Sequence, residues 1–244
     1  MAGAYAAVQR LECFHRLAYA PALLRLLGEL IGAPVLVHPA KIVRIIWPDR
    51  DELVTRPHQD FPYIQGSADT LTVWIPLADR LTGTGTLRVI PGSHRRGVRP
   101  VHPVSGAGGF GVDLQPSDAD WVEFDFRAGD VLVFHAFTVH AATAHRGDRI
   151  RLSADFRYQA ATEPLAREWL QPHPDPSAPN GWADITGQWA SNRWVSLAAG
   201  ANPPLTDLVP PPPAGAGWVE TLDIPSSRLA GTPTQIPAAN GADA

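Results

Sequence analysis

Short β-rich runs, each closed by a turn, recur along the middle of the chain and restrict its fold more than any other feature. Within such a run alternate side chains point to opposite faces, as in a strand with two different surroundings. Little helix is predicted between the runs, and closure into a jelly roll covers the edges of many short strands. The sequence predicts a mainly β fold, a double-stranded β-helix of the jelly-roll, cupin-like kind. The predicted strands are Val35–Val37, Lys41–Trp47, Thr70–Leu77, Leu87–Ile90, Trp121–Phe126, Val131–Phe134 and Arg149–Gln159.

The two ends of the chain differ from this middle part. Between Arg10 and Ile31, apolar residues recur at helical spacing and Pro21 divides them, which predicts two short helices. After about residue 160 the periodicity vanishes and prolines accumulate, yet five tryptophans remain, and segments that do not pack rarely carry such apolar bulk. We expect a jelly-roll core at residues 1–160 and a C-terminal extension at residues 161–244. The extension should pack on the core as irregular coil, with loose last residues.

Composition excludes several classes of function. The formal net charge is −4 and the basic residues are scattered, so no nucleic-acid-binding surface is visible. Cys13 is the single cysteine, which excludes an intrachain disulfide, a thiolate zinc site and an iron–sulfur cluster. Arg25 and Glu29 interrupt the most apolar early stretch, which argues against a signal peptide or membrane span. We expect a cytoplasmic protein without nucleic-acid or membrane partners; its oligomeric state is not predicted.

Three residues are candidate metal ligands. His58 and Asp60 are two apart, so in an extended strand their side chains project from one face. A histidine from a distant strand would complete a facial triad of two histidines and one carboxylate, which suits non-haem iron(II). His140, after the apolar run 131–134, is the candidate. His135 and His145 are each five residues away and would face the opposite side of a continuous strand. A surface hydrogen-bonded pair of His58 and Asp60 is the alternative.

The last predicted strand carries polar residues on one face. Arg151, Ser153, Asp155 and Arg157 alternate along it, and charged groups that point into a small barrel need partners or a ligand. Arg151 is expected to bind a carboxylate, because a planar guanidinium matches that group. Asp155 and Arg157 form either a structural ion pair or a pair that faces substrate, and the sequence does not decide between these.

A long connection lies between His58-Gln59-Asp60 and the segment that contains His140 and Arg151. Residues 99–120 are rich in Gly, Pro and Ser and are expected to form one long loop. Loops of this length inside a compact domain are usually functional or mobile. The segment is therefore a candidate lid.

With these motifs in view, the chain resembles the phytanoyl-CoA dioxygenase (PhyH) family of Fe(II)- and 2-oxoglutarate-dependent oxygenases over roughly residues 31–159. The likeness rests on an ordered set of motifs, because a short His-x-Asp pair alone is common. The set comprises Lys41-Ile42 before Trp47-Pro48, His58-Gln59-Asp60, Thr72 to Leu77, Leu87 to His94, and Gly129-Asp130 through His140 to Arg151.

The resemblance implies roles for individual residues. Iron(II) would be held by the three candidate ligands, and Arg151, eleven residues after the second histidine, would bind the distal carboxylate of 2-oxoglutarate. Thr72 and Trp74 match positions that line the co-substrate pocket, although Trp74 could be ordinary core. Lys41, the only lysine, matches a position that can reach the co-substrate carboxylate, or it is there by chance.

One position departs from the family pattern. Members often have a serine or threonine two residues after the second histidine, where this chain has Ala142. Any hydroxyl contact to the co-substrate is then lost or shifted to Thr143.

The implied activity is oxidation of a C–H bond in a small organic molecule by O2, coupled to conversion of 2-oxoglutarate to succinate and CO2. Because Asp60 supplies a carboxylate where halogenating relatives have a small residue, hydroxylation or another oxidation is favoured over halogenation. A composition rich in arginine, alanine and proline suggests bacterial secondary metabolism. The alternative is a non-oxygenase, cupin-like metal- or sugar-binding protein, which would have no use for a carboxylate-binding Arg151. The substrate and the choice among hydroxylation, desaturation, epoxidation and cyclisation are not predicted.

Overall fold

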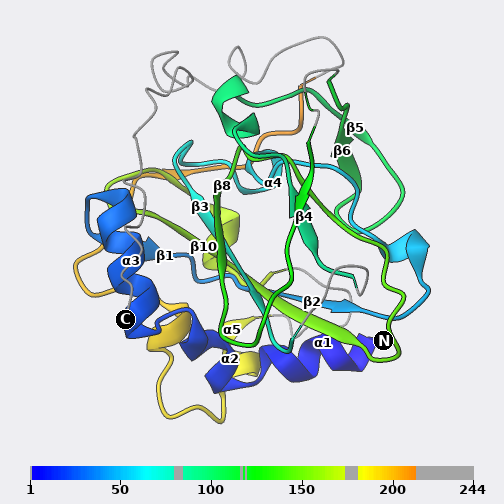
Figure 1. Cartoon of the computed structure of the whole chain (residues 1–244). Coiled ribbons are helices and arrows are strands. Elements are labelled where there is room, and N and C mark those ends of the chain that lie inside the picture. Colours follow the sequence, from blue (N-terminus) through cyan, green and yellow to red (C-terminus); the bar gives the residue numbers. More distant parts are fainter. Residues whose placement is uncertain (1, 80–84, 116–117, 119, 174–180, 213–244) are drawn as a thin grey trace, which may run out of the picture.

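Two antiparallel sheets that face each other form the centre of the computed structural model, which describes residues 2–79, 85–115, 118, 120–173 and 181–212 (Figure 1). The larger sheet has the strand order β1-β10-β3-β8, and β2 also pairs with β10. Its strands are β1 (Val35–Val37), β2 (Ile42–Ile46), β3 (Leu71–Pro76), β8 (Leu132–His135) and β10 (Arg151–Ala160). The smaller sheet, in the order β7-β4-β9, consists of β4 (Leu87–Val89), β7 (Val122–Glu123) and β9 (His140–Ala142).

Strand β10 organises the larger sheet. The first half of β10 pairs with β2 and its end pairs with β1, while β3 runs along its other side. Phe156 and Tyr158 point away from the smaller sheet into the main apolar cluster. Arg151, Asp155 and Arg157 point the other way, into the space between the sheets. The predicted grouping of these charged residues on one face is confirmed.

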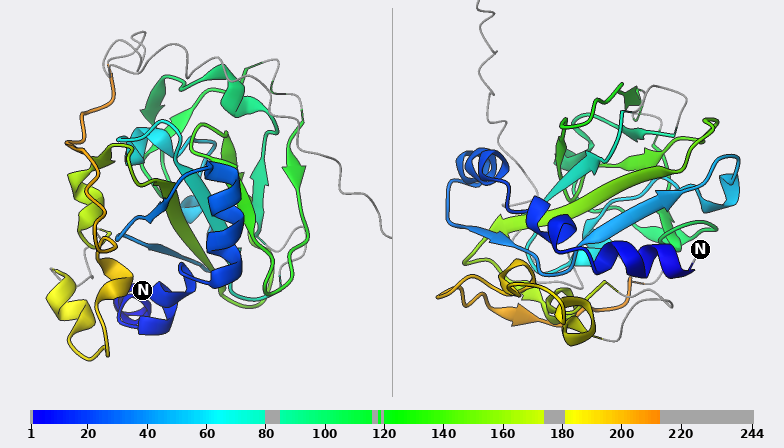
Figure 2. Two further views of the ribbon diagram at one scale, coloured as in Figure 1. Left: turned by 90° about the vertical axis from the view of Figure 1, so that its left-hand side faces the viewer. Right: turned by 90° about the horizontal axis from the view of Figure 1, so that it is seen from below.

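Three N-terminal helices cover the outer face of the larger sheet (Figure 2). They are α1 (Ala2–Gln9), α2 (Glu12–Leu17) and α3 (Pro21–Ile31). Phe14 and Leu27 from the helices pack with Val73 and Phe156 from the sheet. The two predicted helices are confirmed as α2 and α3. Helix α1 was not predicted, because its apolar residues show little concentration on one side.

Other predictions need correction at particular elements. The strand predicted over residues 121–126 is shorter, since only β7 forms there.

The expected long loop over residues 99–120 is wrong in part, because β5 (Val101–Pro103) and β6 (Phe110–Val112) pair within it. The Tyr63 hydroxyl donates to the Phe110 carbonyl at 2.7 Å and ties this hairpin to α4 (Phe61–Ile64). Strands of three residues interrupted by glycine leave little periodic pattern in a sequence. The lid role stays a prediction. Two short 3₁₀ helices complete the core, η1 (Asp51–Leu53) and η2 (Ser93–Arg96).

The described part of the C-terminal segment packs on this core. It contains β11 (Leu165–Ala166), η3 (Arg167–Leu170), α5 (Trp182–Thr186), η4 (Arg193–Val195) and β12 (Leu205–Thr206). Trp169 lies in an apolar cluster with Ile42 and Ile64. The Trp194 indole donates to Glu12 of α2 at 2.8 Å. A division of the chain at residue 160 stays a prediction. The expectation of loose last residues falls on residues 213–244, which lie outside the described residues.

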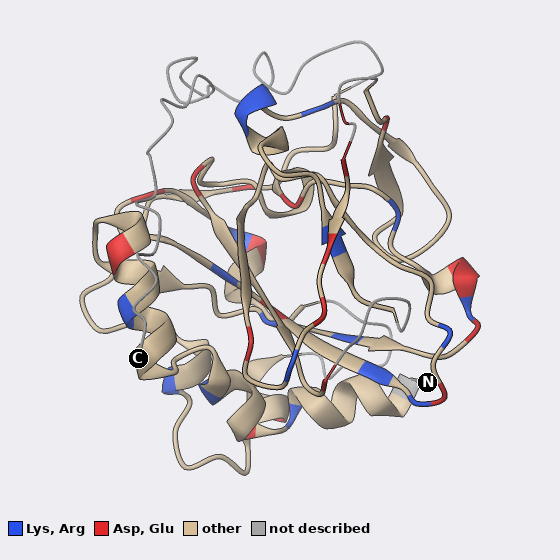
Figure 3. Ribbon diagram, in the orientation of Figure 1, with Lys and Arg blue, Asp and Glu red and all other residues tan. Residues whose placement is uncertain are grey.

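Charged residues of both signs are spread over the fold. Basic positions are interspersed with acidic ones over the sheets and helices in the view of Figure 3. Among the described residues, no helix combines the length and the apolar character that crossing a membrane requires.

Candidate metal centre

His58 and His140 face each other across a pair of backbone hydrogen bonds. The His58 amide donates to the His140 carbonyl and the His140 amide donates to the His58 carbonyl, both at 3.0 Å. Asp60 lies directly before α4 and has helical backbone angles, φ −73° and ψ −32°. The expected strand over residues 58–60 is therefore wrong. The side chains of His58 and Asp60 converge because the chain bends into a helix after His58, not because they alternate along a strand.

The segment that contains His140 is also not one strand. Strand β8 ends at His135 in the larger sheet and β9 begins at His140 in the smaller one, so the chain changes sheets between them. The alternation that favoured His140 over its neighbours does not apply across this break. The structure still brings His140 to His58 and Asp60. His145 instead contacts the Arg149 carbonyl at 2.6 Å.

The three side chains form a compact, buried set of metal-ligating atoms. One ligand atom from each of His58, Asp60 and His140 lies within 4.8 Å of the other two, and Asp60 Oδ1 is 3.8 Å from both Nε2 atoms. Nδ1 of His58 contacts the Arg56 carbonyl at 2.8 Å, and Nδ1 of His140 contacts the Thr138 carbonyl at 2.9 Å. Because a carbonyl only accepts, each Nδ1 carries the proton and each Nε2 presents its lone pair. Two nitrogens and one oxygen in this arrangement fit a facial iron(II) site.

Electrostatics keeps these groups in the protonation state that binds metals. Burial lowers the pKa of His58 to about 3 and also lowers the pKa of His140. Burial alone would raise the pKa of Asp60, but Arg157, the two imidazoles and the Thr72 hydroxyl hold it well below its usual range. At neutral pH the set therefore consists of two neutral imidazoles and one carboxylate, the deprotonated forms that metals require.

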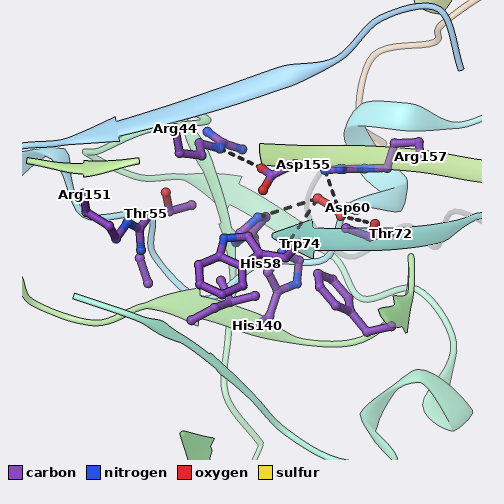
Figure 4. Close-up of a pocket in the computed structure, with 13 residues that line it drawn as sticks. Arg44, Thr55, His58, Asp60, Thr72, Trp74, His140, Arg151, Asp155 and Arg157 are labelled. Atoms are coloured by element: carbon purple, nitrogen blue, oxygen red, sulfur yellow. Dashed lines mark hydrogen bonds and ion pairs between the residues drawn. The ribbon is translucent and has the colours of Figure 1, made fainter. Parts of the chain in front are cut away.

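The second carboxylate oxygen of Asp60 is held by one hydrogen bond and one ion pair (Figure 4). The Thr72 hydroxyl donates to Oδ2 at 2.6 Å, and Nη2 of Arg157 lies 3.0 Å from the same atom. Thr72 on β3 and Arg157 on β10 are cross-strand partners, so the register of the sheet places both beside Asp60. Oδ1 is left facing the imidazoles, and Asp60 would bind a metal through this one oxygen.

A narrow cavity runs from the three ligands into the space between the sheets. Thr72, Trp74 and Arg151 line it together with the ligands, so six of the eight predicted site residues lie around one space. Arg151 is buried, and its Nη1 donates to the Gly85 carbonyl at 2.9 Å. Its guanidinium carbon lies 5.9 Å from the centre of the Trp74 ring.

Lys41 is not among the residues that line this cavity. It precedes β2 and points to the opposite face from Arg44, as its odd separation of three residues requires. Its Nζ donates to the carbonyls of His38 and Pro39, both at 3.1 Å, and of Trp194 at 2.7 Å. The structure does not bring Lys41 to the expected co-substrate position.

Thr143 likewise lies away from the cavity. Ala142 lines it, and the next residue along the chain faces the other side. The Thr143 hydroxyl accepts from the Thr86 amide at 2.9 Å and contacts Glu123 at 3.2 Å. The hydroxyl contact expected from Thr143 is therefore not in place.

Two polar lining residues were missed from the sequence. Arg44 on β2 points into the cavity, where its Nε donates to Asp155 Oδ2 at 3.0 Å. A charged residue in the middle of an apolar run was the available signal. Thr55 also lines the cavity, but it lies in a polar connection that carries no pattern.

A second, wider cavity of about 340 Å³ adjoins two of the three ligands, His58 and Asp60. It shares Arg44, Thr55, His58, Asp60 and Arg157 with the narrow cavity, so the ligand set opens on two connected spaces. Its other walls come from β2 and the residues before it, α4, the turn between β5 and β6, and the C-terminal segment. The apolar and aromatic residues among them include Ala40, Ile42, Tyr63, Ile64, Trp169 and Leu208.

Comparison with known proteins identifies the family. The family model described as phytanoyl-CoA dioxygenase (PhyH) matches residues 4–153, more than half of the 244 residues. The chain belongs to the PhyH family. The match includes the three candidate ligands and Arg151, and it ends before Asp155 and Arg157.

Two relatives of this chain illustrate how similar it is to other proteins and how much of their length it matches. A 1-deoxypentalenic acid 11-beta-hydroxylase from Streptomyces arenae is 30% identical over 169 residues, which cover 64% of this chain and 60% of the relative. Phytanoyl-CoA dioxygenase domain-containing protein 1 from Mus musculus is 32% identical over 129 residues, 49% of this chain and 44% of the relative. This chain therefore spans 60% or less of the length of these two relatives.

Two solved structures have the same fold as this PhyH chain. The epimerase SnoN, in complex with Fe3+, alpha ketoglutarate and nogalamycin RO, has a TM-score of 0.52 and 26% identity, covering 82% of this chain and 70% of SnoN. The non-heme alpha ketoglutarate dependent carbocyclase SnoK from nogalamycin biosynthesis has a TM-score of 0.50 and 30% identity, covering 62% of this chain and 59% of SnoK. The predicted mainly β, jelly-roll fold is confirmed.

Proposed function

We propose that this chain is an Fe(II)- and 2-oxoglutarate-dependent dioxygenase that hydroxylates or otherwise oxidises a C–H bond of a small organic molecule, with release of succinate and CO2. One observation carries the proposal: His58, Asp60 and His140 lie at one end of a narrow cavity that Arg151 also lines. Membership of the PhyH family and the likeness to SnoN, whose structure holds Fe3+ and alpha ketoglutarate, support it.

The proposed ligands would hold iron(II) from one side. Bound iron(II) would supply the centre at which 2-oxoglutarate and O2 react. Two imidazoles and Asp60 Oδ1 would provide three donors to it, and the cavities beside them would admit 2-oxoglutarate and O2. The backbone carbonyls behind each Nδ1 fix the orientation of both rings, as outer contacts commonly do at metal sites.

Arg151 is proposed to bind the distal carboxylate of 2-oxoglutarate. Its guanidinium is kept in place by the Gly85 carbonyl and lies near the Trp74 ring, so little freedom is lost on binding. Leu87 and Phe134 add apolar walls to the same cavity and exclude water from the keto acid.

The substrate is proposed to be a small molecule of secondary metabolism. Relatives are described as acting on deoxypentalenic acid or as belonging to nogalamycin biosynthesis. The wider cavity beside the ligands has a volume in the range that holds small organic ligands. Cytoplasmic location stays a prediction from cysteine usage.

Anaerobic visible absorbance tests the proposed function without knowledge of the substrate. Iron(II) and then 2-oxoglutarate are titrated into the metal-free protein and into Asp60→Ala, Arg151→Leu and Arg149→Leu variants. We expect a metal-to-keto-acid charge-transfer band in the parent, and Asp60→Ala should need much more iron(II) to develop it, because one of three metal ligands is removed. Arg151→Leu should need at least about tenfold more 2-oxoglutarate, because a charge-assisted pair contributes roughly 1.5–3 kcal/mol.

Arg149 is exposed and does not line the cavity, so its leucine variant is the matched control and should titrate like the parent. No band in the parent at saturating iron(II) and 2-oxoglutarate would reject the dioxygenase and favour a cupin-like metal- or sugar-binding protein.

A further inference from the structure

The wider cavity indicates the class of the substrate. We propose that this cavity binds the organic substrate as a compact, mostly apolar molecule that carries one carboxylate, and that Arg44 and Arg157 recognise the carboxylate. This inference rests on the proposed function, because it assigns the narrow cavity and Arg151 to 2-oxoglutarate.

The apolar part of the cavity comes from segments far apart in the chain. Ile42 lies on β2, Ile64 on α4, and Trp169 and Leu208 belong to the C-terminal segment. Three of these side chains already pack together in one apolar cluster, with Leu208 against it. A wall of this kind favours a hydrocarbon body, because burial of apolar surface contributes about 25 cal/mol per Å². The C-terminal segment thus takes part in selecting the substrate.

The polar part of the cavity consists of two arginines with unused donors (Figure 4). Arg157 is 3% exposed; its Nη2 meets Asp60, while Nε and Nη1 have no hydrogen-bond partner among the described residues. Arg44 is 24% exposed at its side chain. Its Nε donates to Asp155, and no described residue accepts from its two terminal nitrogens. Guanidinium edges with free N–H groups match the two oxygens of a carboxylate.

The net charge that the site would have with iron(II) and 2-oxoglutarate bound favours an anionic substrate. The charges of iron(II) and of the 2-oxoglutarate dianion cancel. Glu168 at the cavity is exposed, so solvent screens its charge. The buried or partly buried charged side chains that remain are three arginines and two carboxylates, namely Arg44, Arg151 and Arg157 with Asp60 and Asp155. One positive charge is left in a site of low dielectric, where an unpaired charge is costly. A single carboxylate would neutralise it.

Binding of rigid probes tests the inference on the intact protein. Adamantane-1-carboxylate, adamantane-1-carboxamide and 1-adamantylamine share one apolar body and differ in charge. Anaerobic titration calorimetry with iron(II) and saturating 2-oxoglutarate present measures the affinity for each. We expect the carboxylate to bind at least tenfold more tightly than the amide, and the amine to bind most weakly. Equal affinities, tighter binding of the amine, or no binding of the carboxylate at millimolar concentration would overturn the inference.

Two variants locate the binding site. Arg44→Gln with Asp155→Asn removes one positive and one negative charge together, so no buried charge is left unpaired and the net charge of the site stays the same. The carboxylate preference should fall about threefold, because only the donors of Arg44 are lost. Leu208→Trp fills the cavity from a half-buried position and should abolish binding of all three probes. An unchanged preference in the double variant, or unchanged binding in Leu208→Trp, would also overturn it. The charge-transfer band separates the two proposals, because its absence rejects the dioxygenase, whereas a normal band without carboxylate preference rejects only this inference.

Discussion

Asp60 is the residue on which the proposed metal centre depends most. Its Oδ1 faces two imidazoles, and its Oδ2 is fixed by Thr72 and Arg157. A carboxylate held by its second oxygen cannot rotate away from the metal, so its ligating atom is oriented before the metal arrives. Outer contacts of this kind typically change metal affinity by 10- to 100-fold.

Thr72→Val should weaken metal binding about tenfold, because it keeps the shape of the side chain and removes the hydrogen bond to Asp60. Titration calorimetry with cobalt(II) measures the affinity directly. Thr70→Val is the matched control: Thr70 is equally buried, and its hydroxyl donates to the Ser67 carbonyl instead. Both variants should lose about 1 kcal/mol of stability. An equal loss of cobalt affinity in the two variants would contradict the role of Thr72.

Strand β10 carries both ends of the proposed active site. Arg151 at its start and Arg157 near its end share one face, six residues apart. The position of Arg151 depends on a second element, the turn before β4, where the Gly85 carbonyl accepts from its Nη1. Gly85 has φ +78°, and a Cβ built on it would lie 2.6 Å from the Cβ of His145. The turn therefore tolerates no side chain at this position.

Gly85→Ala should destabilise the fold by about 2–4 kcal/mol, from backbone strain plus the clash with His145. It should also raise the 2-oxoglutarate concentration needed for half-saturation, because the carbonyl that holds Arg151 must move. Urea unfolding and the charge-transfer titration measure the two effects. Gly92→Ala isolates the strain, since Gly92 has φ +76° with nothing within 4 Å of the added Cβ, and it should lose only about 1–2 kcal/mol. Equal losses in the two variants would show that the clash is absent.

The elements that could be predicted from sequence are those with strict alternation. Strands β3 and β10 were expected at nearly their observed ends, and the charged face of β10 followed from the same rule. The bend at Asp60 was missed, although Pro62 in the first turn of α4 is a common start of a helix. Lys41 was placed in the site and Arg44 overlooked because sequence alone does not say which face of β2 turns inward. That choice is made by the pairing of β2 with β10.

Lys41 links three parts of the molecule. Its Nζ donates to the carbonyl of Pro39, which lies near the larger sheet, and to the carbonyl of Trp194 in the C-terminal segment. Its own carbonyl accepts from Gln9 of α1 at 2.9 Å, and the Tyr19 ring centre lies 5.3 Å from Nζ. Burial lowers the pKa of Lys41 to about 7. The packing of α1 and of the segment around Trp194 against the core is therefore coupled to one buried amine.

Stability should rise with pH above about 7 because of Lys41. In the unfolded chain a lysine keeps its proton up to about pH 10.4, whereas the folded protein releases it near pH 7. Between these values the unfolded state binds more protons, so the free energy of unfolding increases with pH. From pH 7 to 9 the parent should gain about 1–2 kcal/mol relative to Lys41→Met, measured by urea unfolding at each pH. Parallel curves for parent and variant would contradict this.

The reciprocal backbone bonds between His58 and His140 have a consequence for the newly made protein. These two residues are 82 positions apart, so a ribosome that has released only the first half of the chain has produced one imidazole and one carboxylate of the set. The third donor arrives together with the strand that closes the small sheet. A chain that has not yet reached His140 thus cannot hold iron(II) with all three proposed ligands.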